Sequence, residues 1–150
     1  RIHRRPHLDD FLETVLELFA HVGIWTASTL AYAIPTLDHF VDRRRLSFVW
    51  GRERCTLRYD RESAEHVYLK PIRKLRRAGY RKEHVLYVDD SPEKLVQSYS
   101  NLVEVRPFLG DPEDAELPLV QRYLQRLGPL PNVRPVEKRW WRRRLLDEHD

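Results

Sequence analysis

The sequence contains no methionine and a single cysteine, Cys55, among its 150 residues. One cysteine rules out a disulfide framework within the chain, which favours a reducing compartment, cytoplasmic or nuclear. Its thiol is interpreted as a small buried apolar group. Because a complete translation product of this length usually contains methionine, we expect the sequence to be part of a longer gene product.

Long apolar runs are also absent, and none approaches the roughly 20 residues that cross a membrane. The five glycines form no phosphate-binding loop, and the seven histidines lack metal-binding spacings such as His-Glu-x-x-His. Transmembrane, nucleotide-binding and zinc-dependent classes are therefore not expected. With 41% hydrophobic and 33% charged residues, the chain is predicted to form one soluble globular domain. Its net charge of +4 weakly favours a phosphorylated or polyanionic partner.

The most informative stretch is an apolar run, residues 85–88, followed directly by Asp89 and Asp90. The run predicts a short buried strand, so the two carboxylates stand at its carboxyl end. In open α/β sheets ligands bind at that edge, and paired carboxylates are natural ligands for a hard cation such as Mg²⁺. Ser91 and Pro92 can start the following helix. The alternative is that the two acids belong to an ordinary turn.

Helix-like and strand-like patterns alternate along the rest of the chain. Periodic apolar positions predict helices over residues 8–21, 28–41, 70–79, 92–98 and 111–127. Short apolar runs predict strands over residues 22–26, 85–88 and 102–105, and a small β-hairpin formed by residues 46–50 and 56–59. This alternation predicts an α/β fold with a doubly wound, mostly parallel sheet flanked by helices and carrying a small β insertion.

Polar residues follow several of these elements at positions suited to a phosphate group. Thr26 ends the first strand, Lys70 precedes the third helix, and Asp89 and Asp90 end the next strand. A phosphoryl group needs hydroxyl and cationic donors for its oxygens and a metal that neutralises developing charge. The order of these residues along the chain therefore predicts a phosphate site at the carboxyl edge of the sheet.

Several segments, taken together and in order, resemble one known family. They are residues 5–12 (RPHLDDFL), 24–28 (IWTAS), 68–70 (YLK), 88–92 (VDDSP) and 106–114 (RPFLGDPED). The combination resembles the FCP/SCP branch of the haloacid dehalogenase superfamily, which includes phosphatases of the RNA polymerase II C-terminal domain. The resemblance implies a haloacid-dehalogenase-like core without a large cap.

The resemblance also implies a role for each polar residue. Thr26 would hydrogen-bond the transferring phosphoryl group, Lys70 would hold phosphate and nucleophile by its charge, and Asp90 would bind Mg²⁺. Asp89 would orient the site, acting through Lys70. Arg52 would contact the substrate, because residues 52–55 (RERC) resemble the Arg-Glu-Ser-Cys segment of the family. Arg54 replaces the serine of that segment, so the substrate preference of the family does not carry over.

One family motif is missing. Members begin with Asp-x-Asp-x-Thr, whose first aspartate attacks phosphorus, and this sequence contains no such motif. In the family fold this motif ends a central strand between the strands of Thr26 and Asp89. A stable fold of residues 1–150 alone is therefore not expected. We expect an upstream segment or another chain to supply this strand and the nucleophilic aspartate.

The leading functional hypothesis is thus a Mg²⁺-dependent aspartyl phosphatase that acts on phosphoserine or phosphothreonine in proteins. The short stretch between Thr26 and Lys70 leaves the site open, which suits a phosphorylated protein or peptide better than a small metabolite. The alternative is a catalytically silent protein-binding module of the same fold. A nucleic-acid binder acting through the basic C-terminal segment has the weakest support.

That C-terminal segment differs from the rest. Three prolines interrupt it, and residues 138–144 place five cations around Trp140 and Trp141. We predict a phosphatase-like core over residues 1–128 and an appended tail over residues 129–150. The tail either docks on an acidic partner, membrane surface or nucleic acid, or packs its tryptophans back on the domain, which is the interpretation we favour.

Overall fold

Helices and short strands alternate along the computed structural model, which describes residues 3–148. The α-helices are Leu8–Leu18 (α1), Leu30–Leu37 (α2), Ile72–Arg77 (α3), Glu116–Leu127 (α4) and Trp141–Asp147 (α5). The strands are Gly23–Trp25 (β1), Phe48–Trp50 (β2), Thr56–Asp60 (β3), Glu65–Leu69 (β4), Tyr87–Asp89 (β5) and Leu102–Glu104 (β6). The predicted α/β class is confirmed. None of the helices in the described part of the chain has the length and hydropathy needed to cross a lipid bilayer.

The strands of residues 3–148 form three separate pairs. β1 and β2 pair in parallel with Ile24 opposite Val49, and β5 and β6 pair in parallel with Val88 opposite Val103. β3 and β4 form an antiparallel hairpin. The predicted parallel pairing is therefore present, but a continuous, doubly wound sheet is not confirmed. β1 and β5 each keep one edge without a strand partner in the described chain.

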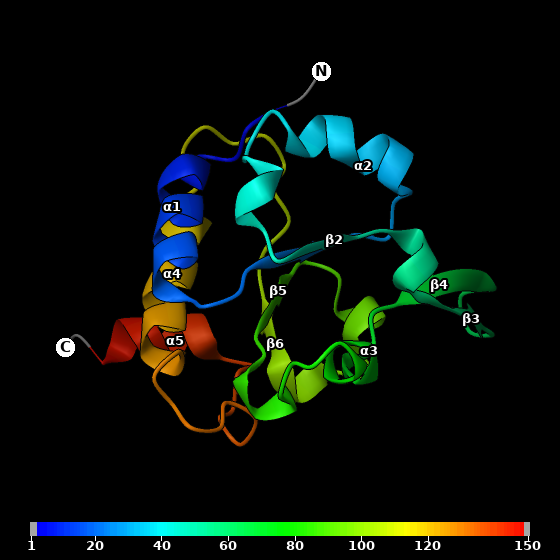
Figure 1. The fold of residues 1–150 in the computed structure, drawn as a ribbon. Coiled ribbons are helices and arrows are strands. Elements are labelled where there is room, and N and C mark those ends of the chain that lie inside the picture. The colour runs from blue at the N-terminus through cyan, green and yellow to red at the C-terminus, as the bar shows by residue number, and fades with distance from the viewer. Residues whose placement is uncertain (1–2, 149–150) are drawn as a thin grey trace.

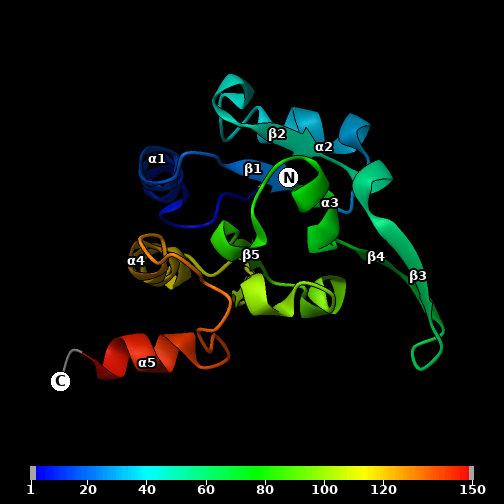
Figure 2. The ribbon, with the colours of Figure 1, turned by 60° about the horizontal axis from the view of Figure 1, so that its bottom comes forward.

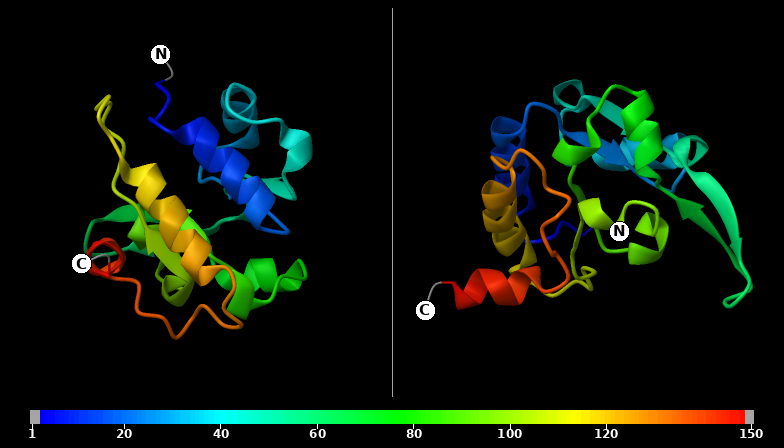
Figure 3. Two further views of the ribbon diagram at one scale, coloured as in Figure 1. Left: turned by 90° about the vertical axis from the view of Figure 1, so that its left-hand side faces the viewer. Right: turned by 90° about the horizontal axis from the view of Figure 1, so that it is seen from below.

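The predicted hairpin within residues 46–69 is wrong in its first strand. Residues 48–50 pair with β1 and are not part of the hairpin. The partner of β3 in the hairpin is β4, a strand that the sequence did not indicate. β4 begins with two consecutive polar residues, Glu65 and His66, so it lacks the alternation that indicates a half-buried strand. Figures 2 and 3 show the β3–β4 hairpin projecting from the body, away from α1, α4 and α5.

Two apolar clusters hold the layers together. Figure 1 shows α1 and α4 side by side on one side of the strands, with α3 and the hairpin on the other. One cluster joins α1, α4, α5 and β6, and its most buried members are Val103, Val120, Trp141 and Leu145. The second joins β2, α3, β5 and β6 through Trp50, Leu75, Tyr87, Leu95 and Leu102. β6 thus lies between the two clusters, with Val103 in the first and Leu102 in the second, and Tyr87 anchors β5, the strand that ends in Asp89, in the second.

Several predicted helices are shorter in the structure. The helix expected over residues 92–98 is a 3₁₀ turn over Pro92–Leu95, and the helix expected from residue 111 begins at Glu116. Ser91 makes no capping hydrogen bond, because its hydroxyl donates to Asp90 Oδ1 over 3.1 Å instead. The chain after Asp89 is therefore a tight turn, which keeps both carboxylates beside the strand end.

The C-terminal segment packs on the domain, as the favoured interpretation predicted for one of its two tryptophans. Trp141 is 1% exposed, stacks on Tyr123 with ring centroids 5.3 Å apart, and donates from Nε1 to the carbonyl of Glu104 over 2.8 Å. Trp140 is 61% exposed. The division into residues 1–128 and 129–150 stays a prediction, and its residues 1–2 and 149–150 lie outside the described chain.

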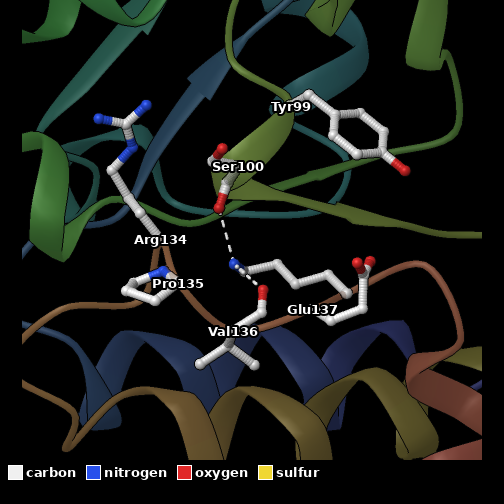
Figure 4. A pocket seen from close by; sticks show the side chains of 7 residues that line it. Tyr99, Ser100, Arg134, Pro135, Val136 and Glu137 are labelled. Atoms are coloured by element: carbon white, nitrogen blue, oxygen red, sulfur yellow. Dashed lines mark hydrogen bonds between the residues drawn. The ribbon is translucent and has the colours of Figure 1, made fainter.

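A buried lysine fastens the loop before α5. Lys138 Nζ donates to the carbonyls of Ser100, Val133 and Val136 over 2.6, 2.5 and 3.0 Å. Burial lowers the pKa of this ammonium group. Lys138 lines a pocket of about 190 Å³, and Figure 4 shows Ser100, Arg134, Pro135 and Glu137 around it. Three carbonyl oxygens already accept hydrogen bonds from the ammonium group of Lys138. We therefore interpret these contacts as the attachment of the loop to the domain.

Candidate active site

The residues predicted to bind phosphate stand at the ends of strands. Thr26 follows β1 directly, Lys70 follows β4, Asp89 is the last residue of β5, and Asp90 comes next. β1 and β5 belong to separate pairs, but they are neighbours, because the ring of Trp25, which precedes Thr26, lies 6.2 Å from the ring of Tyr87 in β5. The hairpin ends in Lys70 and returns the chain toward β5.

The structure joins two of these residues directly. Lys70 Nζ lies 2.6 Å from Asp89 Oδ2, and the two side chains are 8% and 13% exposed. Asp89 Oδ1 accepts a hydrogen bond from the backbone N–H of Ser91 over 2.9 Å. Both oxygens of Asp89 are therefore engaged, and its charge holds the lysine at the end of β5. This is the contact through which Asp89 was predicted to act, although its role stays a prediction.

The ammonium group of Lys70 keeps donor capacity for a ligand. An ammonium has three donor hydrogens, and within residues 3–148 the only hydrogen bond recorded for this one goes to Asp89. Because the group is nearly buried, its electrostatic interactions are stronger than those of a surface lysine. A phosphoryl oxygen placed beside Asp89 would meet a fixed cation with two remaining donors.

The backbone of Lys70 is fixed by residues that the sequence did not single out. Its N–H donates to the carbonyl of Lys94 over 2.8 Å. Its own carbonyl accepts from the hydroxyls of Tyr87 and Ser98, each over 3.1 Å, and Ser98 Oγ accepts from the N–H of Ile72 over 2.8 Å. Ser98 is 2% exposed, and burial raises the pKa of Tyr87. Ser98 lies among other polar residues, Gln97, Ser100 and Asn101, so no signal in the sequence singled it out.

Thr26 has a hydroxyl that is ready to donate. Its N–H continues the β1–β2 ladder with a 2.9 Å bond to the carbonyl of Trp50. Its Oγ1 accepts from the N–H of Ser28 over 3.1 Å, which leaves the hydroxyl hydrogen without a recorded acceptor in the described chain. The turn therefore orients the oxygen while the donor hydrogen remains available, as a phosphoryl-binding threonine requires.

Arg52 lies next to the loop that follows β1. Its Nε donates to the carbonyl of Ala27 over 2.9 Å, and its guanidinium stacks over the ring of Tyr68 at 4.7 Å from the centroid. Arg52 is exposed, so the remaining N–H groups of its guanidinium face solvent beside Thr26. This position fits the predicted substrate contact.

Cys55 connects the two halves of the site. Its Sγ lies 3.8 Å from the carbonyl oxygen of Thr26, and the residue is half-buried. Burial raises the pKa of the thiol, while the positive charge of Lys70 opposes that shift. Cys55 was expected to be a small buried apolar group, but the residue is only half-buried and its sulfur lies near the carbonyl oxygens of Thr26 and Gly51. Cys55 thus links Thr26 to the start of the β3–β4 hairpin, which ends before Lys70.

The donor set for a metal ion is only partly present. Within residues 3–148, no three His, Cys, Asp or Glu side chains converge as a metal cage. Asp89 is committed to Lys70, whereas Asp90 is exposed and accepts only the hydroxyl of Ser91. Protein-bound Mg²⁺ commonly uses one or two carboxylates together with water and phosphate oxygens. Asp90 therefore fits as one ligand of such an ion.

No separate domain covers the site in the described chain. Between Thr26 and Lys70 the chain forms α2, β2, short 3₁₀ turns and the β3–β4 hairpin. The hairpin points away from the body in Figure 2, so it borders the site without closing over it.

Comparisons with known proteins agree with this arrangement. The sequence model of the family described as NLI interacting factor-like phosphatase matches residues 1–134. The chain is 35% identical over 114 residues to the human CTD small phosphatase-like protein, covering 76% of this chain and 38% of the relative. It is 32% identical over 133 residues to the human carboxy-terminal domain RNA polymerase II polypeptide A small phosphatase 1, covering 89% and 47%.

A relative from Schizosaccharomyces pombe, nuclear envelope morphology protein 1, is 27% identical over 136 residues, which cover 90% of this chain and 26% of that protein. The chain thus spans between a quarter and a half of the length of these relatives. The match of the family model extends from β1 through β6 and includes Thr26, Lys70, Asp89 and Asp90. The predicted resemblance to the FCP/SCP branch is confirmed, and the chain belongs to the NLI interacting factor-like phosphatase family.

Proposed function

We propose that this chain forms the core of a Mg²⁺-dependent aspartyl phosphatase of the haloacid dehalogenase superfamily that acts on phosphoserine or phosphothreonine in proteins. The observation that carries the proposal is the nearly buried Lys70–Asp89 pair at the end of β5. An isolated buried ion pair contributes little to stability, so a cation held there with free donors is better explained by an anionic ligand. Membership of a phosphatase family supports phosphate as that ligand.

Each residue then has a defined task. Lys70 holds the phosphoryl oxygens by charge, Thr26 donates its hydroxyl hydrogen to one of them, and Asp89 keeps the ammonium group of Lys70 in place. Asp90 would hold Mg²⁺, which, when bound, neutralises charge on the phosphoryl oxygens. Arg52 would contact the polypeptide that carries the phosphate, from its position beside Ala27.

The nucleophilic aspartate is proposed to arrive on a strand between β1 and β5. Those two strands have unpaired edges in the described chain, and their side chains are neighbours, because the rings of Trp25 and Tyr87 lie 6.2 Å apart. Val88, in the middle of β5, is 38% exposed, which is unusual for a central strand. A strand inserted there would join both parallel pairs into one sheet and would place its carboxyl end beside Thr26 and Asp89.

A protein substrate is favoured by the open site and by the relatives. No cap encloses the Lys70–Asp89 pair, whereas a small metabolite is usually enclosed by its enzyme. Two relatives are named as small phosphatases of a C-terminal domain, one of them that of RNA polymerase II. We therefore propose a phosphorylated polypeptide in the cytoplasm or nucleus as substrate, with no role for nucleic acid.

The first test is hydrolysis of a generic aryl phosphate by the full-length protein, with Mg²⁺ and then with a chelator. Turnover that requires Mg²⁺ is the expected result, because this chemistry needs the metal and the nucleophile but no specific polypeptide. Absence of turnover from well-folded, full-length protein would contradict the proposal. It would favour the alternative, a silent protein-binding module of the same fold.

Replacing Asp90 with asparagine tests the metal ligand. The change removes one negative charge and keeps the shape of the side chain, so we expect turnover at saturating substrate to fall by about 100-fold or more. The Mg²⁺ concentration needed for half-maximal activity should rise. Because Asp90 is exposed, the free energy of unfolding should stay within about 0.5 kcal/mol of the parent value.

Glu93→Gln is the matched control for Asp90→Asn. Glu93 is an exposed carboxylate three residues further along, in the 3₁₀ turn, and it takes part in no recorded ion pair of the described chain. Its replacement should leave both turnover and Mg²⁺ dependence unchanged. Equal effects of the two substitutions would remove Asp90 as a specific ligand.

A further inference from the structure

Ion pairs are distributed unevenly over the described chain. Cations near the N-terminus and in the C-terminal segment are mostly paired, as in Arg5–Asp114, Arg45–Glu13 and Arg142–Glu116. Within residues 52–94, by contrast, the Lys70–Asp89 contact is the only recorded ion pair of the described chain. Within the described chain, the other cations of residues 52–94 therefore have no recorded acidic partner.

Three arginines of this region, Arg52, Arg54 and Arg73, are engaged by other groups. Arg54 stacks over the ring of Trp50 at 4.6 Å. Arg73 donates to Gln97 Oε1 over 3.1 Å and to Thr56 Oγ1 over 3.3 Å. Arg54 thus packs on β2, and Arg73 connects α3 to Gln97 and to the first residue of β3. These arginines therefore have a structural role.

Lys74 and Lys94 are not explained in this way. Lys74 makes one long hydrogen bond, 3.4 Å from Nζ to the carbonyl of Cys55, and no contact is recorded for the ammonium group of Lys94 within residues 3–148. Both residues are only partly exposed. Partly buried cations without an acidic partner lose hydration without an ion pair to offset the loss.

Both lysines lie close to the proposed phosphate site. The backbone carbonyl of Lys94 accepts from the N–H of Lys70, and Lys74 reaches Cys55, whose sulfur is 3.8 Å from the carbonyl of Thr26. The charges of Lys70, Lys74 and Lys94 all act on the Cys55 thiol and oppose the rise in its pKa that burial causes. Lys74 thus adjoins Cys55, which contacts Thr26, and Lys94 adjoins Lys70 through the backbone.

The acidic residues nearby leave this charge in place. Glu53 and Glu93 are exposed on the 3₁₀ turns that flank the site, and neither lies within ion-pair distance of a cation in the described chain. Asp89 is committed to Lys70. An anion that reaches Lys74 and Lys94 therefore has no internal carboxylate to displace.

We propose that Lys74 and Lys94 form a second anion site beside the Thr26–Lys70–Asp90 site, and that the substrate is a polypeptide with a second acidic or phosphorylated side chain near the phosphoryl group that is removed. This second site rests on the proposed function, and it specifies that the substrate carries a second negative charge near the phosphoryl group. An open border suits a polypeptide flank, because such a chain can lie across the surface and present two anions at once. Lys74 and Lys94 would then select the substrate, whereas Lys70 acts on the reacting group.

The test compares three phosphoserine peptides on the full-length protein. The first has neutral flanks, the second has one glutamate beside the phosphoserine, and the third has a second phosphoserine at that position. We expect kcat/KM for the two acidic peptides to exceed that for the neutral one by roughly fivefold to twentyfold at low salt. The ratio should shrink as salt is added.

In the double variant Lys74→Gln/Lys94→Gln, kcat/KM for the acidic peptides should come close to kcat/KM for the neutral peptide. Arg139→Gln/Arg143→Gln is the matched control, because it removes the same net charge from exposed residues of the C-terminal segment. The control should keep the preference of the parent protein. A preference restricted to the third peptide would identify phosphate rather than carboxylate as the second anion.

Three results would overturn the second anion site. They are equal kcat/KM values for all peptides in the parent protein, an unchanged preference in the lysine variant, and an equal loss in both double variants. In each of these cases the neutral peptide is still hydrolysed, so the proposed phosphatase function stands. Failure to hydrolyse any peptide or an aryl phosphate would instead remove the function on which this site depends.

Discussion

Replacing Lys70 with alanine is expected to lower kcat/KM for an aryl phosphate by about 10²–10³-fold or more. The substitution removes the nearly buried ammonium group that faces the phosphoryl oxygens and leaves Asp89 as an uncompensated buried carboxylate. Breaking a buried pair on one side costs about 3–5 kcal/mol of stability. Activity should therefore be measured together with urea unfolding, so that loss of rate is separated from loss of folded protein.

A double variant, Lys70→Met/Asp89→Asn, separates the effect of Lys70 on the rate from its effect on stability. Removing both charges should restore much of the stability, because no unpaired charge remains buried, whereas the rate should stay low. Arg77→Ala serves as the control, since Arg77 is an exposed cation of α3 without a recorded partner in the described chain. Recovery of turnover in the stable double variant would show that Lys70 acts on folding and not on phosphate.

The largest effect on stability is expected at Trp141. Its ring is 1% exposed, stacks on Tyr123, and donates to the carbonyl of Glu104 at the end of β6. Trp141→Ala should therefore lower the free energy of unfolding by about 3–5 kcal/mol, through the cavity and the unmet carbonyl. Urea unfolding followed by circular dichroism measures the change.

Trp140→Ala is a closely matched control, because it changes the same side chain one position earlier. Trp140 is 61% exposed and has no recorded ring contact in the described chain, so its loss should cost no more than about 0.5 kcal/mol. A similar, small effect of both substitutions would mean that the C-terminal segment is not part of the folded core.

The pair of tryptophans also shows where sequence patterns are sufficient and where they are not. An apolar run followed by acids identified the strand that ends in Asp89, because a continuous apolar run is typical of a strand in the interior of a parallel sheet. The position of Thr26 after its strand followed from the same rule. Which tryptophan of two neighbours is buried depends on the rotation of α5 against α4, which a run of seven residues does not encode.

The sequence also did not indicate which strands pair with each other. Residues 48–50 have the composition of a strand, but a short apolar run carries no information about its neighbour, so their pairing with β1 was missed. The positive charge of residues 138–144 was misleading for a similar reason. Lys138, Arg139, Arg142 and Arg143 are engaged by carbonyls or acids within the domain, and such partners become visible only after folding.

The aromatic residues packed behind the site have a practical consequence for optical spectroscopy. The ring of Trp25 lies edge-on to Trp50, with centroids 5.0 Å apart, and close to Tyr87. Trp25 also precedes Thr26 directly in the chain, so a ligand seated at that hydroxyl alters the surroundings of an indole one residue away. The emission of Trp25 should thus report phosphate binding without a labelled substrate, and replacing the distant, exposed Trp140 with phenylalanine would remove a background signal.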